Sequence, residues 1–204
     1  MKIGHINYLN LLPFYQFLKQ KGIKVKKSYP SQVNEWFEKG VIEAAFISSI
    51  KSKNKKCFDA GICANRKVKS VLVCEGEGDD VESATSNMLA RVLKIKGRVV
   101  IGDKAFNEKG CLDLAEIWYK RYKLPFVFAR FCCNGNYKSY KKLINSFLQK
   151  KQKIPYSVLK KEADKIGITY KEAKEYLDQI IYYKLGWREK KALKLFLRKV
   201  DESL

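Results

Sequence analysis

The stretch Gly4-His5-Ile6-Asn7-Tyr8-Leu9-Asn10 decides the fold of this chain. Its short apolar run ends in amide-bearing residues, as is typical of a strand that brings its carboxyl end to a ligand crevice in an open α/β sheet. The same pattern returns in Ala45-Phe46-Ile47-Ser48-Ser49 and in Leu124-Pro125-Phe126-Val127-Phe128-Ala129. Together the three stretches predict an α/β protein whose ligand site lies where the strands end.

The N-terminal quarter predicts a β-α-β-α-β unit. Its strands are expected at residues 2–6, 23–29 and 43–48. Pro13 lies in the first turn of a helix that ends at Gly22, and Pro30 starts another that ends at Gly40. Each helix must bury its apolar stripe on the sheet, so we expect right-handed crossovers and parallel strands.

Beyond this unit, the run from Val68 to Cys74 is continuous enough in Val and Leu to be a strand buried on both faces. The acidic, glycine-bearing stretch 75–80 follows and is the strongest candidate boundary in the chain. The remaining elements are expected to be a helix at 83–95, a strand at 99–103, a helix at 110–122, a strand at 126–131 and, from Tyr137 onward, only helices, at 137–151, 155–166, 170–182 and 187–202.

The order of these elements makes the chain leave one lobe near residue 72 and return to it near residue 129. We expect a larger lobe of residues 1–71 and 130–204 and a smaller lobe of residues 72–129. Two hinge strands, near 70–74 and 126–131, would join the lobes. This double crossing is the layout of a two-lobe, periplasmic-binding-protein-like fold of type II, with parallel-rich sheets and a helical C-terminal region.

The composition indicates a globular protein with an excess of positive charge. The 204 residues are 46% hydrophobic, and their formal net charge is +21. The lysines are spread along the whole chain, which favours a solvated surface over a nucleic-acid-binding arm, although the positive field would still attract a dicarboxylate. No apolar run approaches the ~20 residues that a membrane helix needs, and the N-terminus has no signal-peptide pattern. We therefore expect a cytoplasmic protein with no membrane partner.

The six cysteines indicate no metal centre. They lack Cys-x-x-Cys spacing, and the chain has a single histidine. A zinc site of two Cys and two His cannot be built from one such chain. We expect reduced, mostly buried thiols and no metal.

The quoted stretches, together with Lys67-Val68-Lys69-Ser70-Val71-Leu72-Val73, resemble the chorismate dehydratase family, which opens the futalosine route to menaquinone. The C-terminal stretches Tyr182-Tyr183-Lys184-Leu185-Gly186-Trp187-Arg188-Glu189 and Leu193-Lys194-Leu195-Phe196 are similar to the family's signature. The resemblance runs from residue 2 to residue 200. Family members usually carry another helix and strand where Leu93 and Val99 are almost directly joined here, so we expect a smaller second lobe.

The resemblance implies an enzyme that removes water from chorismate to give 3-[(1-carboxyvinyl)oxy]benzoate, with no cofactor. It also assigns the two catalytic positions to Asn10 and Ser70. From position alone, Asn10 is equally suited to capping the helix that follows, and Ser70 to satisfying backbone groups beside it. Both side chains are poor bases, so we expect them to orient the substrate while its own enolpyruvyl carboxylate removes the proton.

Further polar residues are candidates for binding the substrate. Ser48 and Ser49 end the third strand, and Thr85 and Ser86 open a helix, where backbone N–H groups form an anion site. Ordinary capping explains Thr85 and Ser86 equally well. The pair Gly102-Asp103 matches a family pair, with Asp103 either a general base or a cap that shapes the pocket wall. The minor candidates are His5 and Asn7.

Two other classes of function compete with this interpretation. The segment 154–181 resembles a helix-turn-helix by pattern, which leaves nucleic-acid binding as an alternative, although such hairpins are common in any helical segment. The fold alone also permits a non-catalytic binding protein for a small carboxylate. The sister enzyme that makes 1,4-dihydroxy-6-naphthoate is disfavoured. We expect that enzyme to have a histidine in the second lobe, and the single histidine of this chain is His5. The sequence gives no oligomeric state.

Overall fold

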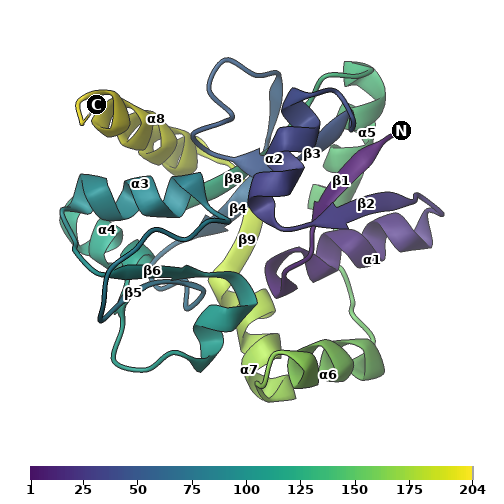
Figure 1. Ribbon diagram of the computed structural model, residues 1–204. Coiled ribbons are helices and arrows are strands. Elements are labelled where there is room, and N and C mark those ends of the chain that lie inside the picture. The colour runs from purple at the N-terminus through teal and green to yellow at the C-terminus, as the bar shows by residue number, and fades with distance from the viewer. Residues whose placement is uncertain (204) are drawn as a thin grey trace.

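Two β-sheets organise the computed structural model, which describes residues 1–203 (Figure 1). The larger sheet has the strand order β2-β1-β3-β8-β4-β9, and the smaller has the order β6-β5-β7. The larger sheet contains β1 (Ile3–Ile6), β2 (Val25–Ser28), β3 (Ala44–Ser48), β4 (Cys57–Ala64), β8 (Phe126–Cys133) and β9 (Ile181–Lys184). The smaller sheet contains β5 (Val71–Cys74), β6 (Arg98–Ile101) and β7 (Leu112–Asp113).

Helices cover both sheets. They are α1 (Leu12–Gln20), α2 (Pro30–Glu38), α3 (Ala84–Leu93), α4 (Leu114–Tyr122), α5 (Tyr137–Gln149), α6 (Tyr156–Lys165), α7 (Tyr170–Glu175) and α8 (Trp187–Asp201). Two 3-10 segments, η1 (Leu9–Leu11) and η2 (Gly102–Asn107), and one π-helical segment, η3 (Tyr176–Ile180), complete the chain. In Figure 1, α6 and α7 lie together at the bottom of the view, and α3 and α4 lie beside the smaller sheet.

The N-terminal unit agrees with the predicted β-α-β-α-β order. Strand β1 pairs in parallel with both β2 and β3. Helix α1 has a proline in its first turn and buries Phe14, Phe17 and Leu18. The Phe14 ring packs edge-on against Phe46 of β3 and Phe131 of β8. The helix is therefore held on the sheet by the apolar stripe that its sequence shows.

Among the strand pairs of the two sheets, only those of β1 with β2 and β3 are parallel. Strand β8 is antiparallel to both β3 and β4, and the smaller sheet is antiparallel throughout. The prediction missed β4, whose first half is interrupted by the exposed Asp59 and by a register shift against β8. The prediction also made the next strand too long, since β5 begins at Val71 and not at Val68.

The early part of that predicted strand is a turn. Lys69 has a φ of +63°, outside the range of a strand, and the Asp113 carboxylate accepts the N–H groups of Val68 (2.9 Å) and Lys69 (2.8 Å). The backbone groups that would have joined a ladder are satisfied by a side chain instead. Ser70 therefore lies in a turn before β5 and not within a hinge strand.

We expected only helices in the C-terminal region, but this region also contains the strand β9. The helix predicted at 170–182 is α-helical to Glu175 and π-helical to Ile180, and the chain then enters β9, which pairs with β4 at the edge of the larger sheet. Residues Ile181, Tyr182 and Tyr183 are β-branched or aromatic, and pairing with a free sheet edge outweighs their helical spacing.

The connection between the two sheets runs from β4 to β5 and back from β7 through α4 to β8. Strands β5 and β8, which we expected to form the hinge, do not pair with each other in either sheet. The division into lobes of residues 1–71 with 130–204 and of residues 72–129 stays a prediction. The terms larger and smaller lobe below refer to these ranges.

The expectation of six reduced thiols is wrong for this structure. Disulfides join Cys57 to Cys132 and Cys74 to Cys111, while Cys63 and Cys133 are free and buried. The first pair arises because Cys57 and Cys132 face each other across β4 and β8. The Glu108 carboxylate lies with Cys74 and Cys111 in a cluster of potential metal ligands, but the two sulfurs are bonded to each other.

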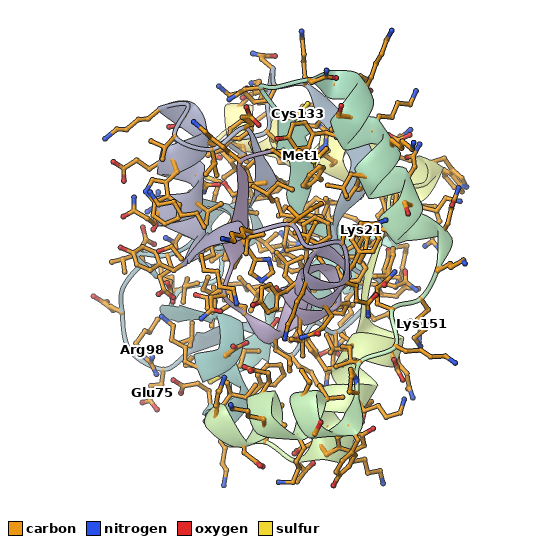
Figure 2. The ribbon with its side chains drawn as sticks, turned by 90° about the vertical axis from the view of Figure 1, so that its right-hand side faces the viewer. Met1, Lys21, Glu75, Arg98, Cys133 and Lys151 are labelled. Carbon is orange, nitrogen blue, oxygen red and sulfur yellow. A yellow bond between two sulfur atoms is a disulfide. The ribbon has the colours of Figure 1, made fainter. Side chains whose placement is uncertain are left out.

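The outer surface is covered with long charged side chains. Figure 2 shows nitrogen-tipped side chains projecting around most of the outline. Within residues 1–203, no helix combines the length and the apolar character that crossing a membrane would require.

Candidate functional site

Four of the predicted site residues meet at one small cavity, which we call the central cavity. It has a volume of about 50 Å³ and lies between the strand ends of the larger sheet and the start of α3. Its polar lining consists of Tyr8, Asn10, Ser48, Ser70, Ser83 and Ser86. Its apolar lining includes Ile6, Ile62, Val71, Ile101, Phe128 and Ala129. Residues far apart in sequence thus line one neutral cavity.

Asn10 does not cap the helix that follows it. The N-cap of α1 is Leu11, and Asn10 lies inside η1. Its backbone carbonyl accepts a hydrogen bond of 2.5 Å from the Tyr183 hydroxyl of β9. Its side-chain Oδ1 is buried and has no hydrogen-bond partner within residues 1–203. A buried amide oxygen without a partner costs about 1–3 kcal/mol, which a ligand in the cavity can recover.

Ser70 is held by a residue that the sequence did not single out. The Ser70 hydroxyl lies 2.7 Å from the hydroxyl of Tyr176, at the start of η3. Tyr176 is buried, and burial raises the pKa of its hydroxyl, while hydrogen bonds with Ser70 and the Asn10 side chain oppose this shift. Tyr176 thus holds one of the two predicted catalytic side chains, Ser70. Its sequence context, an apparently continuous helix, carried no signal of this role.

The two serines at the end of β3 differ in their surroundings. Ser48 lines the cavity and is fixed by Asn34 of α2, whose Oδ1 accepts the Ser48 N–H (3.0 Å) and whose Nδ2 donates to the Ser48 hydroxyl (3.2 Å). The Ser49 hydroxyl instead donates to the Val127 carbonyl (2.6 Å). Ser49 therefore fastens β3 to β8 and is not among the residues that line the cavity.

The start of α3 forms another wall of the central cavity. Ser83 is the N-cap, and its hydroxyl accepts the Ser86 N–H (3.1 Å) and donates to the Ser86 hydroxyl (2.8 Å). The N–H groups of Ala84 and Thr85 have no acceptor within the helix. The Thr85 hydroxyl accepts the Ile50 N–H (3.4 Å) and does not line the cavity. The helix start therefore offers backbone donors and a partial positive charge to an anion.

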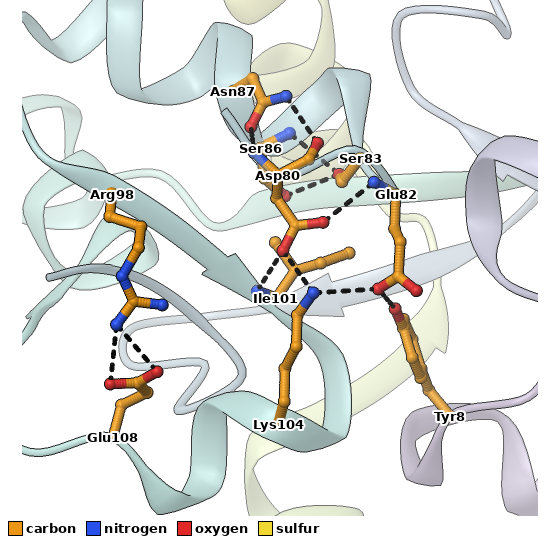
Figure 3. Close-up of polar contacts among 10 residues, drawn as sticks. All are labelled: Tyr8, Asp80, Glu82, Ser83, Ser86, Asn87, Arg98, Ile101, Lys104 and Glu108. Atoms are coloured by element: carbon orange, nitrogen blue, oxygen red, sulfur yellow. Dashed lines mark hydrogen bonds and ion pairs between the residues drawn. The ribbon is translucent and has the colours of Figure 1, made fainter. Parts of the chain in front are cut away.

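A polar network joins the two predicted lobes beside the cavity (Figure 3). The Tyr8 hydroxyl donates to Glu82, and Lys104 pairs with both Glu82 (3.2 Å) and Asp80 (2.8 Å). The Asp80 carboxylate is buried and also accepts the N–H groups of Glu82 (2.9 Å) and Ile101 (3.3 Å). Tyr8 belongs to the larger lobe, and the other residues of the network belong to the smaller one.

Gly102 lets Tyr8 lie directly against the smaller sheet. Its φ is +71°, and a Cβ at this position would lie 2.4 Å from the Tyr8 ring. Its N–H donates to the carbonyl of Ser70 (2.9 Å). Gly102 therefore shapes the wall through Tyr8 and Ser70 and does not itself line the central cavity.

His5, Asn7 and Asp103 line a different cavity on the other side of residues 7–9. This outer cavity has a volume of about 310 Å³, and Tyr8 lines both cavities. Asp103 Oδ1 accepts the Leu9 N–H (2.9 Å). The N-cap of η2 is Ile101, so Asp103 does not cap this segment, which was one of the two roles predicted for it. Burial raises the pKa of Asp103 to about 6, and burial with the nearby Lys27 lowers the pKa of His5 to about 3.

The central cavity is chemically neutral. Among the described residues that line it, Tyr8 alone can ionise. Burial, followed by the hydrogen bond to Glu82, raises the pKa of the Tyr8 hydroxyl far above its ordinary value. The cavity thus offers amide and hydroxyl groups for orientation, but no carboxylate, imidazole or ammonium group.

Comparison with known proteins identifies the family of this chain. A family described as menaquinone biosynthesis matches residues 1–97 and 82–202. A chorismate dehydratase from Campylobacter jejuni is 41% identical over 215 aligned positions, which cover 97% of this chain and 96% of that protein. The chain belongs to the chorismate dehydratase family. The two matched segments overlap at residues 82–97, which hold α3 and the short connection to β6.

Two solved structures share the fold of this member of the chorismate dehydratase family. A crystal structure of a protein from Archaeoglobus fulgidus superposes with a TM-score of 0.70 at 12% identity, over 98% of this chain and 96% of that one. The alkanesulfonate-binding protein SsuA from Xanthomonas axonopodis pv. citri, bound to MOPS, gives a TM-score of 0.55 at 12% identity, over 99% and 91%. The predicted periplasmic-binding-protein-like fold is confirmed.

Proposed function

We propose that this protein is a chorismate dehydratase, a hydro-lyase that converts chorismate to 3-[(1-carboxyvinyl)oxy]benzoate at the opening of the futalosine route. The observation that carries the proposal is the meeting of Asn10 and Ser70 at a neutral cavity, with the Ser70 hydroxyl bonded to Tyr176. Family membership supports the same assignment. An elimination that ends in an aromatic ring needs orientation and a base, and no resident cofactor takes part in the proposal.

The reaction balances without an external reagent. The ring C3–H bond breaks, its electron pair becomes part of the ring π system, and the C4–O bond breaks to release the hydroxyl group. The proton and the hydroxyl group leave together as water. Because no strong base lines the central cavity, the substrate's own enolpyruvyl carboxylate is the base in this proposal.

The site residues have distinct roles in the proposal. The buried Asn10 amide and the Ser70 hydroxyl, held by Tyr176, orient the ring and its leaving group. Ser48 and the free N–H groups at the start of α3 bind a carboxylate of the substrate. Neutral donors suit this purpose, because a lysine in contact with the enolpyruvyl carboxylate would weaken it as a base.

Entry of the substrate requires Tyr8 to move. A cavity of about 50 Å³ holds only a few waters, which is far less than a ring with two carboxylates needs. The Tyr8 hydroxyl is fixed by Glu82, and its ring lies on Gly102. The lobes would part at this contact to admit chorismate and then close to exclude water from the elimination.

The test mixes pure protein with chorismate and follows the product by mass spectrometry and ultraviolet absorbance. The wild type should give an aromatic product lighter than chorismate by one water. Asn10→Ala and Ser70→Ala should each lose turnover by about a hundredfold or more. His5→Gln should keep most of it, because a group with a pKa of about 3 is a poor base at neutral pH.

Two results would contradict the proposal. If folded wild-type protein binds chorismate and returns it unchanged, the protein is a binding protein. If His5→Gln alone abolishes turnover while its circular dichroism and melting temperature match the wild type, the substrate does not supply the base.

A further inference from the structure

The outer cavity contains a histidine that the proposed reaction does not use. His5 lies on β1, its side chain is 3% exposed, and its Nδ1 has no hydrogen-bond partner within residues 1–203. Burial keeps this imidazole neutral. A neutral imidazole has one donor and one acceptor, so the unpartnered nitrogen costs about 1–3 kcal/mol that a bound ligand could recover.

The charges around this cavity leave one cation free. Lys165 pairs with Glu162 at 2.6 Å, so these two lining residues neutralise each other. Lys27 lies over the Tyr15 ring, with its Nζ 3.3 Å from the ring centre. Within residues 1–203, Lys27 has neither an ion pair nor a hydrogen bond. Its ammonium group is therefore available at the edge of the cavity for a carboxylate.

The remaining walls suit a ring that carries a hydroxyl group. The Tyr15 and His5 rings lie 5.3 Å apart, and Leu12 and Ile166 add apolar surface. Asp103 uses Oδ1 to accept the Leu9 N–H, whereas its Oδ2 has no hydrogen bond within the part of the chain that the structure describes. Oδ2 can accept a hydroxyl proton. The volume of about 310 Å³ is sufficient for a small cyclic molecule.

We propose that the outer cavity is a second ligand site, which binds a small cyclic carboxylate bearing a hydroxyl group. Its carboxylate would pair with Lys27, its ring would pack against Tyr15, and a hydroxyl would donate to Asp103 while His5 bonds to the ligand edge. The proposed substrate belongs to this chemical class, but the inference does not depend on the dehydration. The site contacts Tyr8 and the Leu9 N–H, so its ligand would touch the segment that carries Asn10.

His5 makes the test direct because it is the only histidine of the chain. Protein labelled at histidine gives a single set of imidazole signals in nuclear magnetic resonance spectra. Titration with 3-hydroxybenzoate should shift these signals with saturation and a dissociation constant on the order of 1 mM or below. Benzoate, which lacks the hydroxyl group, should bind several-fold more weakly, and inorganic phosphate should give no saturating shift.

Three variants locate the site. Lys27→Gln should weaken binding about tenfold, as expected for loss of a charge-assisted contact. The neighbouring Lys26→Gln is the matched control, since Lys26 lies over the Trp36 ring and not at this cavity, and it should bind as the wild type does. Ser70→Ala, which changes only the central cavity, should also leave the titration unchanged.

The proposal is overturned if 3-hydroxybenzoate gives no saturating shift at His5. It is also overturned if Ser70→Ala removes the shift while Lys27→Gln keeps it, because the ligand would then occupy the central cavity. An equal response to phosphate would overturn the assignment to a cyclic carboxylate. None of these results depends on turnover, so a failure here is distinguishable from a failure of the proposed dehydration.

Discussion

Tyr176 shows how a single hydroxyl can organise the central cavity. It bonds to Ser70 at 2.7 Å from a buried position. Tyr176→Phe keeps the ring but removes the bond that orients Ser70, so kcat should fall about tenfold with little change in KM. Tyr140→Phe is the control, because that hydroxyl bonds to Glu43 (2.6 Å) away from the cavity. Equal kcat values for the two variants would exclude the orienting role.

Asp103 should make the stability of the fold depend on pH. Burial raises its pKa from 3.8 to about 6, so the folded protein keeps a proton there that the unfolded chain has already lost. This contribution is complete below the unfolded pKa and disappears as pH rises through the folded pKa. Asp103→Asn does not titrate but still accepts the Leu9 N–H. Its free energy of unfolding relative to the wild type should therefore rise by ~2 kcal/mol between about pH 4 and about pH 7.

Urea unfolding at several pH values checks this expectation for Asp103. A constant difference between the variant and the wild type across the range would mean that the carboxyl group titrates normally. The measurement reports only on stability, so it is independent of any effect on turnover.

Among the elements, the start of α3 has both a structural and a binding role. Ser83 caps the helix, and both Ser83 and Ser86 line the central cavity. Ser83→Ala should lower stability by ~1 kcal/mol and raise KM several-fold, since the frayed first turn no longer holds its donors in place. Asn136→Ala is the control. Asn136 is the N-cap of α5, its Oδ1 accepts the Ser139 N–H (3.1 Å), and it does not line the central cavity. This control should lose similar stability with unchanged KM, and a parallel rise in its KM would show that the effect is general.

Elements also mark the limit of what the sequence could predict. Pro13 and Pro30 were sufficient to predict where two helices begin. The prediction that Asn10 and Ser48 meet at the ends of their strands is also correct, because both line the central cavity. The role of Tyr176 could not be predicted, because its contact with Ser70 depends on how η3 and β9 return to the sheet. That return depends on pairing with β4 across more than a hundred residues, which no local periodicity encodes.

At the scale of the whole molecule, the charge of +21 is spread over a surface rich in lysine, while the central cavity is neutral. Such a field attracts an anionic substrate from solution without altering the site where it reacts. Raising the ionic strength should therefore lower kcat/KM for chorismate several-fold and leave kcat unchanged. Steady-state kinetics across a salt series checks this expectation. A kcat/KM that does not respond to salt would show that the positive surface does not attract the substrate electrostatically.

The hydrogen bond from Tyr183 to Asn10 joins residues that are 173 positions apart. On the ribosome the N-terminal end of the chain emerges first, so Asn10 waits for a further 173 residues before its supporting partner exists. Loop closure over such a separation is slow, which makes completion of the catalytic pocket a late event in folding. Nascent chains that stall before β9 would hold the predicted motifs of the N-terminal half and yet lack the hydrogen bond that supports Asn10.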